Sequence, residues 1–248
     1  MKISNPGLSG GVVALCLLAQ TGSAQSARTP LFVSPEQLNM AAILPAPPAG
    51  DSWQSASEIA DLRRIQETRT PAAIAHAQSD EAEESIFAFA DVLGERFTRA
   101  ELPITALLSE HVRHDEGVIV NPAKNFFHRP RPYRLDASIK PVCKTTDNPT
   151  DYSYPSGHGT TGYLEALVLL QMVPEMRNAI LARADDYAYS REVCGVHYAS
   201  DEAASKAVAY SMMAIMMNHP QFKKELEAAR AETRKALGLT DLPDSAGH

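Results

Sequence analysis

Length, composition and charge already exclude several classes of protein. The chain has 248 residues, and its 23 basic and 30 acidic side chains give a formal net charge of −7. Proteins that bind nucleic acid or anionic membranes favour basic surfaces, so neither partner is expected here. A chain of this length forms one large domain or two small ones.

The first 24 residues have the layout of a secretory signal peptide. A short apolar run from Val12 to Ala19 follows Lys2, and Gly22-Ser23-Ala24 ends it with small residues. We expect cleavage after Ala24, export to the periplasm, and one mature domain over residues 25–248. No stretch approaches the roughly 18 consecutive apolar residues of a membrane span, so no span is expected.

The mature chain shows helical periodicity and no strand-like alternation. After an extended, proline-containing lead-in over residues 25–50, apolar residues recur at helical spacing from about residue 51 to 65. Pro71 restarts a polar helix, and an apolar segment that begins at Ile86 stops at Gly94. A further helix is expected over residues 104–120, with Asn121-Pro122 as a break or a fresh helix start. The remaining helices are expected over residues 157–173, 174–190, 197–218 and 222–237. The predicted fold class is all-α, a single-domain helical bundle.

Three short clusters concentrate residues that suit a tetrahedral oxyanion. Together they supply three cations, two histidines, one carboxylate and a glycine-containing turn. The clusters are Lys124-x6-Arg131-Pro132, Pro155-Ser156-Gly157-His158 and Ser190-Arg191-x5-His197-x3-Asp201. The polar segment over residues 133–154 is expected to form a loop over this site.

The cations and the glycine turn can bind a phosphate group. Arg131 and Arg191 each carry a planar guanidinium that can bind two phosphate oxygens at once, and Lys124 would add a point charge. Ser156-Gly157 at the start of a helix would aim backbone N–H groups at the same oxygens.

The two histidines indicate chemistry on the phosphate rather than storage. His197 and Asp201 are four residues apart at a predicted helix start, so they lie on one face. The carboxylate can hold one ring nitrogen and leave the other free to attack phosphorus. His158 has no carboxylate near it in the sequence, and it suits a general acid. Lys124, Arg129, Arg131 and Arg134 form a local basic cluster in this acidic chain. His128 lies beside this basic cluster and could touch the substrate.

The three clusters resemble the tripartite signature of the type 2 phosphatidic acid phosphatase superfamily, with eleven specified positions in order. Among its members, the chain is most similar to bacterial class A non-specific acid phosphatases, a likeness that Tyr154 and Cys194-Gly195 share. The resemblance implies a bundle of the acid phosphatase and vanadium haloperoxidase type. It implies a phosphohistidine at His197 and no metal or cofactor. The phosphate would be surrounded by Lys124, Arg131, Ser156, Gly157, His158 and Arg191, with Asp201 orienting the nucleophile.

One position departs from the class A pattern. Threonine usually follows the second-cluster histidine, whereas here Gly159 intervenes before Thr160. The departure leaves the catalytic set intact, but it leaves the subgroup and the substrate preference open.

Two cysteines remain if Cys16 leaves with the signal peptide. In an oxidising compartment Cys143 and Cys194 can form a disulfide. The bridge would close a loop of about 52 residues and stabilise the fold by roughly 4 kcal/mol on the chain-entropy model. The alternative is two free buried thiols.

The sequence therefore predicts a metal-independent acid phosphatase with a broad range of small phosphate monoesters as substrates. One alternative is a vanadium-dependent haloperoxidase, because vanadate mimics phosphate in the same pocket. Another is a phosphate-binding protein without activity. The physiological ester and the oligomeric state, a homo-oligomer included, stay open.

Overall fold

The computed structural model describes Met1 and residues 29–240 of the chain. The signal peptide predicted for residues 1–24 lies outside the described residues apart from Met1, so the domain boundary at residue 25 stays a prediction. Within residues 29–240 every regular element is a helix, which confirms the all-α class. In that same part of the chain, no helix combines the length and the apolar character needed to cross a membrane.

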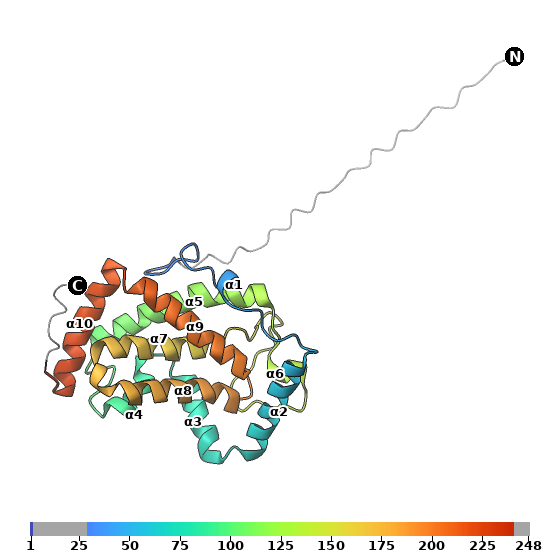
Figure 1. Ribbon diagram of the computed structural model, residues 1–248, viewed down its shortest axis with the longest axis horizontal. Helices are drawn as coiled ribbons and strands as arrows, with labels where there is room; N and C mark the ends of the chain where they lie inside the picture. The colour runs from blue at the N-terminus through green and yellow to red at the C-terminus, as the bar shows by residue number, and fades with distance from the viewer. Residues whose placement is uncertain (2–28, 241–248) are drawn as a thin grey trace.

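Helix α7 (Gly157–Met172) forms the centre of the bundle (Figure 1). It is buried along almost its whole length because its sequence is apolar on nearly every face. It packs against α5 (Pro103–Phe127), α8 (Arg177–Val193), α9 (Ala199–Met216) and α10 (Pro220–Leu237). The second sequence cluster lies at the N-terminus of this central helix, so the surrounding helices hold it in place.

Helices from the N-terminal part of the chain lie on more than one side of this core, since the first packs against α5 and later ones pack against α8 (Figure 1). Two of them begin with a hydroxyl cap: the side chain of Ser52 accepts a hydrogen bond from the backbone N–H of Ser55, and that of Thr70 accepts one from Ala73. α2 and α3 both pack against α8. These elements are α1 (Met40–Ile43), α2 (Trp53–Thr68), α3 (Pro71–Ala82), the 3₁₀ helix η1 (Ile86–Phe89) and α4 (Ala90–Leu93).

The break or fresh start predicted at Asn121-Pro122 is wrong, because α5 continues to Phe127. Pro122 is exposed, so the backbone hydrogen bond that proline removes lies on the solvent side of the helix. The helix ends at His128, which has a left-handed φ of 52°. A short helix, α6 (Pro132–Leu135), then interrupts the segment that was predicted to be a loop.

The C-terminal half follows the predicted series of helices with small changes at their ends. Residues Pro174–Met176 form a 3₁₀ turn, η2, before α8 begins. The methionines of α9, Met212, Met213 and Met216, are buried in the core. The last helix, α10, ends at Gly238, whose φ of 68° gives the left-handed cap expected of a glycine there.

Candidate active site

His197 and Asp201 meet at the start of α9, although His197 lies outside the helix. The helix begins at Ala199, and Asp201 in its first turn accepts a 3.0 Å hydrogen bond from the backbone N–H of Tyr198 through Oδ2. The same oxygen lies 3.2 Å from Nδ1 of His197. Both side chains are buried. The capping geometry therefore brings the carboxylate to the ring.

Arg131 determines which nitrogen of His197 carries the proton. Its Nη1 lies 3.0 Å from Nε2 of His197. A guanidinium can only donate, so Nε2 must accept with its lone pair and the ring proton lies on Nδ1, toward Asp201. Burial, followed by the positive charges of Arg131, Lys124 and Arg191, holds the pKa of His197 well below its usual value. The ring is therefore neutral, with a nucleophilic lone pair next to the cations.

The second cluster forms the first turn of α7. Ser156 is its N-cap, and its Oγ accepts a 3.1 Å hydrogen bond from the backbone N–H of Gly159. The N–H groups of Gly157 and His158 precede the first helical hydrogen bonds, so they have no acceptor within the helix. A Cβ atom at position 157 would lie 3.2 Å from the carboxylate of Glu116, so glycine fits this tight place.

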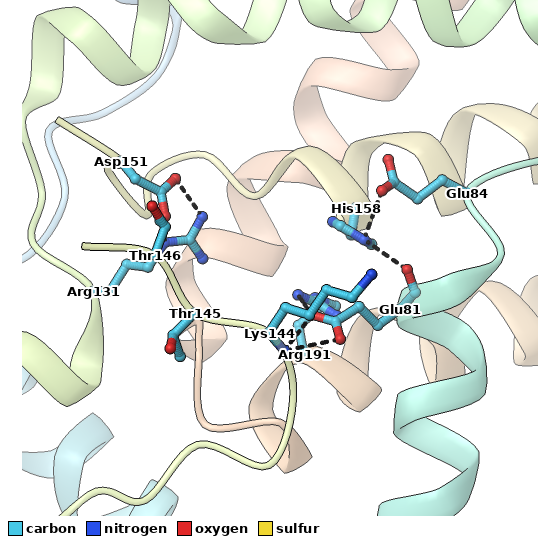
Figure 2. Close-up of a pocket in the computed structure, with 9 residues that line it drawn as sticks. All are labelled: Glu81, Glu84, Arg131, Lys144, Thr145, Thr146, Asp151, His158 and Arg191. Carbon is cyan, nitrogen blue, oxygen red and sulfur yellow. Dashed lines mark hydrogen bonds and ion pairs between the residues drawn. The ribbon is translucent and has the colours of Figure 1, made fainter. Parts of the chain in front are cut away.

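A cleft of about 240 Å³ brings together parts of all three clusters (Figure 2). Arg131 lies on one side of it and His158 on the other, and the view includes Arg191 near the loop that carries Lys144. The lining residues are Glu81, Glu84, Arg131, Lys144, Thr145, Thr146, Asp151, His158 and Arg191.

Each of the three predicted phosphate contacts in the cleft faces a carboxylate. Arg131 donates to Asp151 through Nε and Nη2, at 2.7 and 2.8 Å. Arg191 faces Glu81, and His158 faces Glu84. A cleft that binds an anion would need these pairs to open or to share their donors, since the carboxylates already neutralise the cations.

Arg191 is almost fully buried at the end of α8. Its Nη2 lies 3.5 Å from Oε1 of Glu81. Within residues 29–240, no acceptor lies within hydrogen-bond reach of its buried Nε. That donor is therefore available to a phosphate oxygen.

His158 has a carboxylate partner that its sequence neighbourhood does not contain. Its Nε2 lies 3.2 Å from Oε1 of Glu84 and 3.3 Å from the backbone carbonyl oxygen of Glu81. His158 lacks a carboxylate neighbour only along the sequence: in three dimensions the segment that follows α3 brings Glu84 beside the start of α7.

Lys124 lies in the last turn of α5, as predicted. Its Nζ donates a 2.8 Å hydrogen bond to the backbone carbonyl of Tyr152. Burial, and to a lesser extent the charge of Arg131, lower its pKa to about 8. The side chain therefore stays positively charged at acid and neutral pH.

Comparison with known proteins identifies the superfamily that the three clusters resemble. Residues 110–225, which contain all three clusters, match the family model of the PAP2 superfamily. The match covers just under half of the chain. The resemblance inferred from the sequence is thereby confirmed.

Curated proteins similar to this chain include three bacterial acid phosphatases. An acid phosphatase of Zymomonas mobilis is 33% identical over 159 residues, which is 63% of this chain and 60% of the relative. A non-specific acid phosphatase of Providencia stuartii is 33% identical over 152 residues, 60% of each chain, and one of Salmonella typhi is 32% identical over 148 residues, 58% of each. The matched region thus spans about 60% of the length of these relatives.

Arg129 lies in the region that matches the PAP2 superfamily model, and its place in the sequence indicated no role for it. Its guanidinium is buried between two carboxylates: Nη1 donates to Oδ1 of Asp201 at 2.6 Å and Nη2 donates to Oε2 of Glu58 at 2.7 Å. It also lies 3.8 Å from the ring centroid of Tyr198. Burial raises the pKa of Asp201, and Arg129 opposes that shift. In the sequence, only the basic cluster pointed to Arg129. The cluster did not show which carboxylates the guanidinium of Arg129 contacts.

Gly159, the departure from the class A pattern, makes room for Glu202. A Cβ atom at position 159 would lie 1.8 Å from Oε2 of Glu202 and 3.1 Å from Oγ of Ser205. Glu202 is buried on α9, and burial raises its pKa well above the ordinary value. Gly159 and Glu202 therefore fit together as a pair, because the glycine leaves the space that the glutamate side chain occupies.

The structure contains the disulfide between Cys143 and Cys194. The prediction is confirmed, and its position is informative. Cys143 precedes Lys144, whose backbone N–H donates to the carboxylate of Glu81 at 3.0 and 3.1 Å. The bridge therefore joins one wall of the cleft to the end of α8.

Residues outside the cleft have other partners. The ring of His128 is exposed and packs edge-on against Tyr152, and it does not line the cleft.

Among the described residues, one group could hold a metal ion by distance: His76, Asp80 and Asp186, with ligand atoms within 4.8 Å of one another. Arg183 already donates to both carboxylates, at 3.2 Å through Nη1.

Proposed function

We propose that this protein is a metal-independent acid phosphatase that hydrolyses phosphate monoesters through a phosphohistidine at His197. The observation that carries the proposal is the alignment of Asp201, His197 and Arg131. It leaves a neutral imidazole with its lone pair directed at a phosphate-binding guanidinium. The similar proteins of Zymomonas mobilis and Providencia stuartii are an acid phosphatase and a non-specific acid phosphatase, which supports both the activity and a broad substrate range.

The first half of the proposed reaction transfers the phosphoryl group to the enzyme. Nε2 of His197 attacks phosphorus, the bond from phosphorus to the ester oxygen breaks, and His158 gives its proton to the leaving oxygen. The positive charge that the phosphorylated ring acquires is stabilised by Asp201. Lys124, Arg131, Arg191 and the N–H groups of the first turn of α7 would neutralise the equatorial oxygens.

The second half returns the enzyme to its starting state. His158, now neutral, takes a proton from water, and the resulting nucleophile attacks phosphorus. The bond from phosphorus to Nε2 breaks, the electron pair returns to His197, and inorganic phosphate leaves. An alcohol in place of water would give transphosphorylation.

The direct test compares two reactions of the purified protein. We expect release of phosphate from a chromogenic monoester at acid pH with EDTA present, and no oxidation of bromide by peroxide after loading with vanadate. Loss of the hydrolysis in EDTA would contradict a metal-independent mechanism. Bromide oxidation without ester hydrolysis would favour the haloperoxidase, and phosphate binding without either reaction would favour a binding protein.

The nucleophile is tested by His197→Ala, which should abolish turnover while phosphate or vanadate still binds. His128→Ala is the matched control, because that exposed histidine does not line the cleft. Retained turnover in His197→Ala would reassign the nucleophile. A normal fold and normal vanadate affinity would show that only the chemical step is lost.

The pH profile should be bell-shaped and displaced to the acid side. His197 must be neutral, and its lowered pKa moves the acid limb below the reference value of about 6.5. His158 must be protonated, and burial together with Arg191 lowers its pKa too, which moves the basic limb the same way. We therefore expect the highest kcat/KM below about pH 6.5, and activity that rises steadily to about pH 9 would contradict this.

We also propose export to the periplasm. The layout of the first 24 residues and the disulfide, which forms in oxidising compartments, support it. N-terminal sequencing of protein from a periplasmic fraction should begin at residue 25. Recovery of the full-length chain from the cytoplasm would contradict it.

A further inference from the structure

Besides the His197–Asp201 pair there is a second carboxylate–histidine pair, His158 with Glu84, and both of its members line the cleft. Nε2 of His158 faces two acceptors, Oε1 of Glu84 at 3.2 Å and the backbone carbonyl oxygen of Glu81 at 3.3 Å. Figure 2 shows His158 between them and the open part of the cleft. Because both partners accept, Nε2 carries the proton in either charge state. Nδ1 is then the nitrogen that gains and loses a proton.

Glu84 is itself held in place from another helix. Nε of Arg113, on α5, donates to its Oε2 at 3.0 Å, and Nη2 contacts the same oxygen. This leaves Oε1 directed at His158. Burial would raise the pKa of Glu84, but His158 and Arg113 outweigh it and bring the pKa to about 2. The carboxylate is therefore ionised at every pH at which the enzyme would work.

We propose that Glu84 is the positioning residue of the general acid His158. It fixes the ring through Nε2–H and stabilises the imidazolium, so that Nδ1 delivers its proton to the leaving oxygen. This inference rests on the proposed phosphatase function and adds to it a residue that lies 74 positions before His158 in the chain.

The two carboxylate–histidine pairs then differ in a way that divides the roles. The His197–Asp201 pair is buried, and the cations beside it keep His197 neutral for attack. The side chains of His158 and Glu84 are 22% and 32% exposed, so protons can exchange with solvent. Different environments can give two similar pairs different pKa values, so that one site holds both a base and an acid.

Several charges act on His158 from the surrounding elements. Burial and the positive charge of Arg191 lower its pKa, whereas Glu84 opposes this, so Glu84 keeps a larger fraction of His158 protonated. The charged and titratable groups around it are Glu84 and Glu81 beside its Nε2, Arg113 behind Glu84, Arg191 and His197 at the phosphate site, and Arg131, Asp151 and Lys144 on the rest of the cleft wall.

Glu84→Gln tests the proposal, because it removes the charge and keeps the size of the side chain. A leaving alcohol of high pKa needs the proton far more than p-nitrophenol does. We expect kcat for an alkyl phosphate to fall on the order of 10- to 100-fold, and kcat for p-nitrophenyl phosphate to fall only a few-fold. The basic limb of the pH profile should move to lower pH.

Glu83→Gln is the matched control, since the neighbouring carboxylate contacts Ser85 and Arg99 instead of His158. It should leave both rates and the pH profile unchanged. Equal losses on both esters in Glu84→Gln with an unmoved pH profile, or no loss at all, would overturn the proposal. A wild-type enzyme that hydrolyses neither ester would overturn the proposed function itself, and this inference with it.

A second measurement does not depend on the variant folding. In ¹⁵N spectra of the wild-type enzyme, the neutral form of His158 should be the Nε2–H tautomer. An Nδ1–H tautomer would overturn the proposal.

Discussion

Arg129 donates a 2.6 Å hydrogen bond to Oδ1 of Asp201, whose Oδ2 lies 3.2 Å from Nδ1 of His197. The proposed nucleophile, His197, is thus held by a buried chain in which Arg129 binds Asp201 and Asp201 binds the ring. Glu58 completes it by binding the other end of the guanidinium at 2.7 Å.

Arg129→Gln should therefore damage both stability and turnover. It leaves two buried carboxylates without their cation, which costs roughly 3–5 kcal/mol in the free energy of unfolding. Misplacement of Asp201 should lower kcat on the order of 100-fold. Urea unfolding and steady-state kinetics measure the two effects. Arg64→Gln is the control, because its ion pair with Asp61 is exposed and its loss should leave the stability nearly unchanged. An Arg129→Gln protein with wild-type stability would contradict this role.

The fit between Gly159 and Glu202 makes a prediction about a pair of substitutions. In Gly159→Ala the new methyl group would lie 1.8 Å from Oε2 of Glu202. We expect a loss of roughly 1–3 kcal/mol in the free energy of unfolding from overpacking. Adding Glu202→Ala should recover part of it, so the two changes should be non-additive in a double-mutant cycle.

Gly50→Ala is the matched control for that pair. There the added Cβ would meet Leu135 at 3.6 Å, an ordinary contact, and stability should change little. Strict additivity between positions 159 and 202 would show that the steric explanation for the missing threonine is wrong.

Glu165, buried in α7, should make the fold less stable as pH rises. Ser109 donates a 2.5 Å hydrogen bond to its Oε1, and burial raises its pKa to about 8, from an ordinary value of 4.5. Between these values the folded state binds a proton that the unfolded state has lost. The free energy of unfolding therefore falls as pH rises from about 4.5 to about 8.

Glu165→Gln should remove this part of the pH dependence. At pH 9 the variant should be more stable than the wild type, on the order of 3 kcal/mol, and the difference should shrink toward pH 5. Urea unfolding across that pH range measures it. Glu227→Gln, on the exposed face of α10, should show no such trend. A constant difference between Glu165→Gln and the wild type would refute the assignment.

The disulfide should contribute both to stability and to the shape of the cleft. The Cys143→Ala/Cys194→Ala variant should lose roughly 4 kcal/mol in the free energy of unfolding, because the loop between the cysteines is long. KM should rise several-fold, since the backbone beside Cys143 binds Glu81. Reductant provides the control: it should lower the stability of the wild type and leave the variant unaffected. Equal stability of variant and wild type would contradict the prediction.

The sequence determined those parts of this protein that depend on neighbouring residues. Helix ends at Ser52, Thr70 and Gly238 follow from local capping. The three clusters pointed to the proposed phosphate-binding set because each is a short motif of fixed spacing. Pro122 shows where local motifs fail. The proline predicts a helix break, but the sequence around it does not reveal that this side of α5 faces solvent, where the helix can continue.

Only the tertiary structure decided which residues support that set. Arg129 reaches Asp201 across 72 positions of the chain. Glu84 reaches His158 across 74 positions, and Glu202 fills the space above Gly159 only because α9 packs on α7. No local spacing encodes these contacts, because they depend on how the helices pack and on the direction in which each side chain leaves its helix.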